Sequence, residues 1–84
     1  MNENEMQEEM ERQMERDRIE SQIRGLVSQL EAPTSDIGDW KIVKCYEAQL
    51  LGNPMPYDLQ ELTTLRQEVR NTINALQERL RYME

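Results

Sequence analysis

Asp39-Trp40-Lys41-Ile42-Val43-Lys44-Cys45-Tyr46, running on to Pro54-Met55-Pro56-Tyr57-Asp58, is the stretch that decides how this chain folds. The only Trp, the only Cys, two of the three Tyr and all three Pro lie in it or near it. The flanking segments are long, charged and rich in residues of good helix propensity. We therefore expect an all-α fold with a long N-terminal helix, a short central helix and a long C-terminal helix. Residues 1–31 would form a charged arm, and residues 37–84 a single small domain.

The central segment is the ambiguous part of the sequence. Residues 40–46 are rich in β-formers, but a strand there would have no second strand to pair with. Gly52 follows it as a typical helix ending, so a helix is favoured. A helical wheel places apolar residues on two sides, namely Ile42, Val43, Tyr46 and Leu50 on one and Ile37, Trp40, Ala48 and Leu51 roughly opposite. Such a helix is expected between two neighbours, either the two long helices or one of them and another molecule.

The N-terminal helix is expected to end before Pro33, because proline disfavours helical geometry at Ala32. Ser35 or Asp36 is then a candidate cap for the next helix. In the N-terminal helix, the first apolar residues recur every four positions on an otherwise charged surface. We call this set the Met stripe; its residues are Met6, Met10 and Met14. It is interpreted either as part of a solvated helix end or as a contact for a second chain, since flexible thioethers suit adaptable interfaces.

The C-terminal helix is predicted from Leu59 to about Met83, because Asp58 and Glu61 have the spacing of a capping box. Its apolar residues recur in heptads that Arg66 interrupts, which is typical of a coiled coil or helical hairpin. The predicted interface, which we call the seam, pairs Leu62, Val69, Ile73, Leu76 and Leu80 with Ile19, Ile23, Leu26 and Leu30. The Arg residues of this helix, Arg66, Arg70, Arg79 and Arg81, are expected to form surface pairs with acids.

Composition excludes several classes of function. The chain has 84 residues, a net charge of −7, one Cys and no His. The acidic balance argues against direct binding to duplex nucleic acid or to an anionic membrane and permits a basic partner. Without His, paired Cys or a Gly-rich phosphate loop, we expect no catalytic site, no metal, no cofactor and no small-molecule substrate. The two lysines, Lys41 and Lys44, suggest either a small anion site or a solvent-facing edge with Lys44 over the Trp40 ring.

The first residues of the sequence carry no visible signal peptide. The first residues have neither a positive n-region nor an apolar h-region, and no apolar run approaches membrane-spanning length. The expected location is therefore the cytoplasm. Cys45 is expected to be a buried, packed thiol.

Part of the chain resembles a group of short phage proteins. The segment from Ile37 to Glu47 is followed by Leu51-Gly52, by Pro56-Tyr57-Asp58 and by Leu62, Arg66, Gln67, Arg70, Ile73 and Asn74. Over about residues 37–80 this pattern is similar to the C-terminal part of short helical proteins from phages and prophages of gut bacteria. The resemblance implies a source, either the bacterial host cytoplasm or the virion, and it implies no activity.

Two functions follow as hypotheses. The first is a non-catalytic protein–protein interaction module, an oligomeric helical adaptor or small structural or assembly protein of a phage. It would act by helix packing through the seam, with Trp40 and Tyr46 locking the geometry or anchoring a partner. Its partners would be further copies of itself, another protein, or both. The alternative is an acidic phage inhibitor of a host defence nuclease, similar to an anti-CRISPR protein, whose N-terminal helix mimics nucleic acid.

Overall fold

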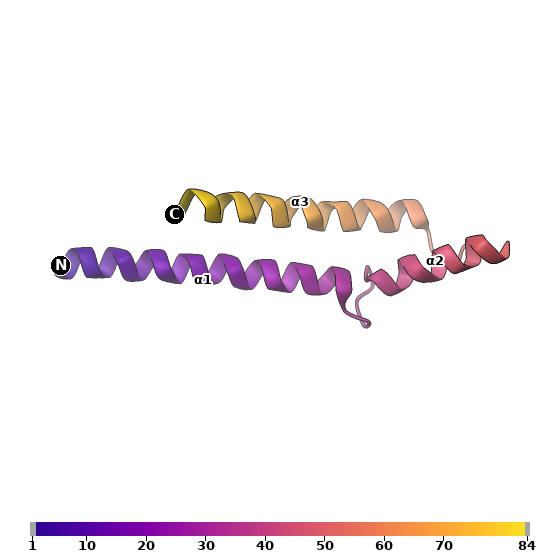
Figure 1. Ribbon diagram of the computed structural model, residues 1–84, viewed down its shortest axis with the longest axis horizontal. Coiled ribbons are helices and arrows are strands. Elements are labelled where there is room, and N and C mark those ends of the chain that lie inside the picture. The colour runs from indigo at the N-terminus through magenta and orange to yellow at the C-terminus, as the bar shows by residue number, and fades with distance from the viewer. Residues whose placement is uncertain (1, 84) are drawn as a thin grey trace.

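The computed structural model describes residues 2–83, and this part of the chain forms three α-helices and no strand. Helix α1 spans Glu3–Glu31, α2 spans Asp39–Leu51 and α3 spans Leu59–Met83. The all-α prediction is confirmed, and the ambiguous central segment is a helix. The molecule is a rod of 68 × 20 × 15 Å (Figure 1).

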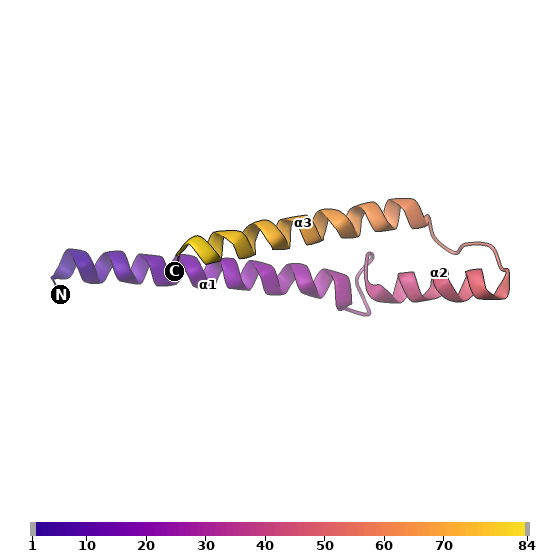
Figure 2. The same cartoon turned by 45° about the horizontal axis from the view of Figure 1, so that its top comes forward.

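Helices α1 and α3 lie side by side and run in opposite directions (Figures 1 and 2). Two contacts fix this register: Arg66 of α3 donates to the Leu30 carbonyl, and Arg79 lies 3.0 Å from the Glu15 carboxylate. From the first contact to the second, the residue number on α3 rises by 13 and the residue number on α1 falls by 15. The two helices are therefore antiparallel. The two long helices thus form a hairpin within one chain.

Helix α2 lies outside this hairpin. It continues beyond the end of α1, and the loop after Leu51 turns back to reach the start of α3 (Figure 2). Of the two placements expected for α2, the one between the two long helices is therefore wrong, and the one between a long helix and another molecule stays a prediction. The physical reason is the loop of residues 32–38, whose internal hydrogen bonds redirect the chain outward instead of folding it back.

Local chemistry sets three of the helix ends. The Asn2 side chain accepts the Glu5 N–H at 2.8 Å, and the Asp58 carboxylate accepts the Glu61 N–H at 3.1 Å. Gly52 closes α2 with a φ of 70°, the left-handed conformation that glycine adopts without strain. Both the Asp58 cap and the Gly52 ending were expected from the sequence.

The start of α2 differs from the prediction. Its N-cap is Gly38, which offers no side-chain hydrogen bond, so neither Ser35 nor Asp36 is the cap. The Ser35 hydroxyl instead donates to the Gln29 carbonyl near the end of α1. Ser35 therefore stabilises the preceding helix rather than the following one.

The core is a thin line of apolar side chains along the hairpin. Ile19, Leu62 and Ile73 of the seam are buried. The remaining seam residues are half-buried, namely Ile23, Leu26, Leu30, Val69, Leu76 and Leu80. Cys45 and Ala48 are buried on the inner side of α2, so the expectation of a packed thiol at Cys45 is confirmed.

The burial pattern predicts which α1 residues carry stability. Ile19→Ala should lower the free energy of unfolding by about 2–4 kcal/mol, because it removes buried methyl groups and leaves a cavity. Met10→Ala, on the exposed side of the same helix, should change it by less than about 0.5 kcal/mol. Urea unfolding followed by circular dichroism checks both. Equal losses in the two variants would contradict the placement of the seam.

Candidate functional site

Arg66 occupies the seam position where the heptad pattern calls for an apolar residue, and it is only 6% exposed. Its guanidinium donates to the Ile37 carbonyl at 2.7 Å, to the Leu30 carbonyl at 3.3 Å and to the Asp39 carboxylate. These acceptors belong to the last turn of α1, the connecting loop and the first residue of α2. The prediction that Arg66 forms a surface pair is wrong: one buried cation joins three segments.

The chemistry of arginine explains this role. A guanidinium presents several N–H donors in a rigid planar fork, so it can satisfy acceptors that lie in different directions. The last carbonyls of a helix also carry a partial negative charge and have no partner within the helix. Leu30 is one such residue of α1, so Arg66 both satisfies its carbonyl and places a cation at the negative end of the helix.

The loop beside Arg66 is closely packed. The Trp40 indole N–H donates to the Ser35 carbonyl at 2.7 Å. A Cβ added to Gly38 would lie 2.6 Å from the Ala32 carbonyl oxygen, so only glycine fits at this position without a backbone shift. The direction of α2 is thus fixed by the Arg66 donors, the Trp40 hydrogen bond and the close approach at Gly38.

Two aromatic rings and both lysines gather around the first turns of α2. The Trp40 and Tyr57 rings meet edge to face, with centroids 5.8 Å apart. The Lys41 ammonium lies 4.7 Å from the Tyr57 centroid and 5.5 Å from that of Trp40, and Lys44 lies 5.5 Å from Trp40. The expected stacking of Lys44 over Trp40 is confirmed. Both lysine charges therefore lie against aromatic faces.

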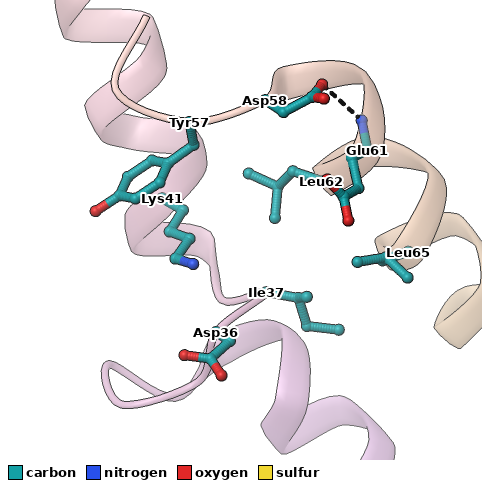
Figure 3. Close-up of a pocket in the computed structure, with 8 residues that line it drawn as sticks. All are labelled: Asp36, Ile37, Lys41, Tyr57, Asp58, Glu61, Leu62 and Leu65. Atoms are coloured by element: carbon teal, nitrogen blue, oxygen red, sulfur yellow. Dashed lines mark hydrogen bonds between the residues drawn. The ribbon is translucent and has the colours of Figure 1, made fainter.

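An open groove lies next to this cluster, between the loops and the start of α3 (Figure 3). It is lined by Asp36, Ile37, Lys41, Tyr57, Asp58, Glu61, Leu62 and Leu65. Three carboxylates surround the single ammonium, so the potential here disfavours a small anion, and Asp58 is already used as a helix cap. Within residues 2–83, no three His, Cys, Asp or Glu side chains are placed to hold a metal ion.

The outer side of α2 is an apolar surface, which we call the α2 patch. Its residues are Val43, Tyr46 and Leu50, whose exposed fractions are 52%, 61% and 68%. They follow at spacings of three and four, so they form one line along the helix. Leu51, the last residue of α2, is also exposed, at 74%, but it does not lie on this line. Contiguous exposed apolar groups of this kind are uncommon on monomeric proteins unless they bind something.

The structure divides the residues predicted to mediate association into two groups. All nine seam residues face the hairpin interior and are buried or half-buried. Trp40 is half-buried and holds the loop, whereas Tyr46 is exposed at the centre of the α2 patch. Arg79 and Arg81 form the expected surface pairs, with Glu15 and Glu78.

Comparisons with known proteins give no assignment: no family model, no curated protein and no solved structure matches this chain. Among the described residues, no helix is both long and apolar enough to cross a bilayer.

Sequence reasoning missed the role of Arg66 and the exposure of Leu51. The break in the heptad pattern at Arg66 was the available signal, because a charged residue in a seam must find partners or stay at the surface. Two of its partners are backbone carbonyls, 29 and 36 residues away in the chain. No spacing rule connects residues so far apart.

The Arg66 contacts predict an asymmetry between two arginines of α3. Arg66→Met should lower the free energy of unfolding by about 2–3 kcal/mol, because it leaves buried carbonyls without a donor. Arg70→Met changes an exposed arginine one turn later and should cost less than about 0.5 kcal/mol. Thermal and urea unfolding measure both variants. A loss at Arg66 no larger than at Arg70 would show that the buried contacts contribute little.

Proposed function

We propose that this chain is a non-catalytic protein–protein interaction module in which the hairpin is a stem and the α2 patch is the binding surface. The observation that carries the proposal is the exposure of Val43, Tyr46 and Leu50 on a helix whose direction is fixed by buried contacts. An apolar surface held in place before binding loses little conformational entropy when a partner arrives. Tyr46, at the centre of the line, is a residue type common among interface anchors.

A second copy of the chain is the partner that best fits the α2 patch. Two α2 helices packed antiparallel about a two-fold axis would set Val43 of one copy against Leu50 of the other, with Tyr46 near the axis. The spacing of three and four is that of helices that interlock in pairs. At the start of α2, the Asp39 carboxylate is already paired with Arg66.

The thin core gives a reason for association. Small chains bury a modest fraction of their surface, and two-helix hairpins have little apolar area to remove from water. Five apolar residues are buried among residues 2–83. Pairing through α2 would bury further apolar area without disturbing the seam, and so would stabilise the folded chain.

In this proposal the protein is an oligomeric helical adaptor or a small assembly protein. The similarity of residues 37–80 to short phage proteins favours a phage setting, in the host cytoplasm or in the virion.

The alternative, an acidic inhibitor of a host nuclease, is favoured by one observation: α1 from Glu3 to Glu11 carries five Glu and no basic residue. Such a segment has the charge to occupy a basic groove, although nothing in it specifies the spacing of phosphates.

The adaptor proposal predicts the solution mass. Light scattering on a sizing column should give a dimer, twice the 10.0 kDa of the chain, and Tyr46→Glu should give a monomer. A carboxylate in the paired apolar surface would be buried without a partner, which is unfavourable. Tyr82→Glu is the matched control, since Tyr82 is also exposed but lies near the end of α3, and it should remain a dimer. A wild-type chain that stays monomeric over a wide concentration range would contradict self-pairing through α2.

A further inference from the structure

The Met stripe forms a second unpartnered surface, on the back of α1. Met6, Met10 and Met14 are between 51% and 63% exposed. Met10 and the buried Ile19 are nine residues apart, which at about 3.6 residues per turn is close to two and a half turns. The Met stripe therefore faces away from the seam, and it is not an extension of the hairpin core that α3 fails to reach.

The end of α1 that carries this stripe also extends beyond α3. Met83, at the end of α3, shares a groove with Glu9, Arg12, Gln13 and Arg16, so residues 3–8 project past the hairpin (Figures 1 and 2). The projecting turns are nevertheless a formed helix, because Asn2 caps them. In this projecting segment, at least two sides of the α1 helix are therefore open to contact with a partner.

Charge identifies the kind of partner. From Glu3 to Glu11 the helix carries five Glu and no cation, and the first two arginines, Arg12 and Arg16, both line the groove with Met83. At about 3.6 residues per turn, the side chains beside the Met stripe are those of Glu3, Gln7, Glu11, Gln13 and Asp17, whereas Glu5 and Glu8 lie on the seam side. The one cation near the stripe, Arg18, is paired with Glu15. A second copy of the same segment would bring Glu against Glu within a Debye length of about 8 Å at physiological salt. A basic partner would instead be attracted.

We propose that residues 3–17 bind a basic amphipathic helix of another protein. The apolar side chains of that helix would pack on the Met stripe, and its Lys and Arg side chains would lie over Glu3, Glu11 and Asp17. Unbranched, polarizable methionines adapt to different apolar shapes, and amphipathic helices are commonly bound by an apolar strip rimmed with opposite charge. Met6 and Met14 are about 12 Å apart along the helix, at 1.5 Å per residue, which matches about two turns of a partner.

This inference goes beyond the proposed pairing through α2, because it concerns the opposite end of a rod 68 Å long. The two surfaces differ in charge as well as place. The α2 patch has little net charge and suits a second copy, whereas the Met stripe is acidic and suits a different, basic chain. A dimer joined at α2 would present two such ends to its partners.

The test uses a fluorescein-labelled peptide of about 18 residues, with Lys on one face and Leu on the other, long enough to form a helix when bound. A permuted peptide of the same composition has no apolar face. Fluorescence anisotropy with the full chain in about 0.15 M salt should show the amphipathic peptide binding at least about tenfold more tightly than the permuted one. Replacing Met6, Met10 and Met14 together by Gln should lower its affinity by about tenfold or more.

Gln has a helix propensity close to that of Met, so circular dichroism should show the triple variant unchanged in helix content. The matched control replaces Val43, Tyr46 and Leu50 by Gln, which should dissociate the dimer and leave peptide affinity unchanged. Loss of self-association and loss of peptide binding are thus separate readouts.

The proposal would be overturned if both peptides bound equally well and the triple Met variant bound them as tightly as the wild type. That result would favour the nuclease-inhibitor alternative, in which charge alone acts. No binding of the amphipathic peptide would also overturn it.

Discussion

The buried guanidinium of Arg66 is the interaction on which the rest of this structure depends. A charged group inside a protein is costly unless its donors find acceptors, and here three segments supply them: the end of α1, the connecting loop and Asp39 at the start of α2. The loop could not move away without leaving a buried cation unsatisfied. Arg66 therefore contributes less as an ion pair, since Asp39 is over half exposed, than as a fixed set of donors for backbone oxygens.

The position of α2 follows from this constraint. The chain leaves α1, turns through a loop held by Arg66, Ser35 and Trp40, and continues outward rather than back along the hairpin. One side of α2 then packs inward through Cys45 and Ala48, and the other side is left in solvent. The proposed binding surface thus depends on a buried polar contact at the start of the same helix.

The two exposed apolar surfaces differ in the chemistry they offer. The α2 patch is rigidly placed, nearly uncharged at its centre and contains Tyr46. The Met stripe lies on a projecting helix among carboxylates. Neither includes a nucleophile next to a base, and neither gathers metal ligands within the described residues. Both suit recognition of other helices, which is why an adaptor with two different ends is the account we favour.

Much of the fold could be predicted because it depends on local chemistry. Pro33, Gly52 and the Asp58 cap mark helix ends by effects that reach only a few residues, and the heptad spacing of Leu62, Val69 and Leu76 marks the seam. The placement of α2 could not be predicted in this way. A helical wheel shows that α2 has two apolar sides. Which of them contacts the rest of the chain depends on the loop of residues 32–38 that precedes it. That loop is held by Arg66, whose acceptors are distant in the chain and are backbone atoms that any residue carries.

Amide hydrogen exchange in Arg66→Met tests the central claim most directly. Exchange reports the stability of each helix separately, so it can separate a loosened junction from a weakened hairpin. If Arg66 fixes the direction of α2, the amides of residues 35–51 should lose protection strongly. Those of Ile19 and Ile73 in the seam should keep most of theirs. A uniform loss along all three helices, or unchanged protection in α2, would contradict the claim that this one buried side chain holds α2 in place.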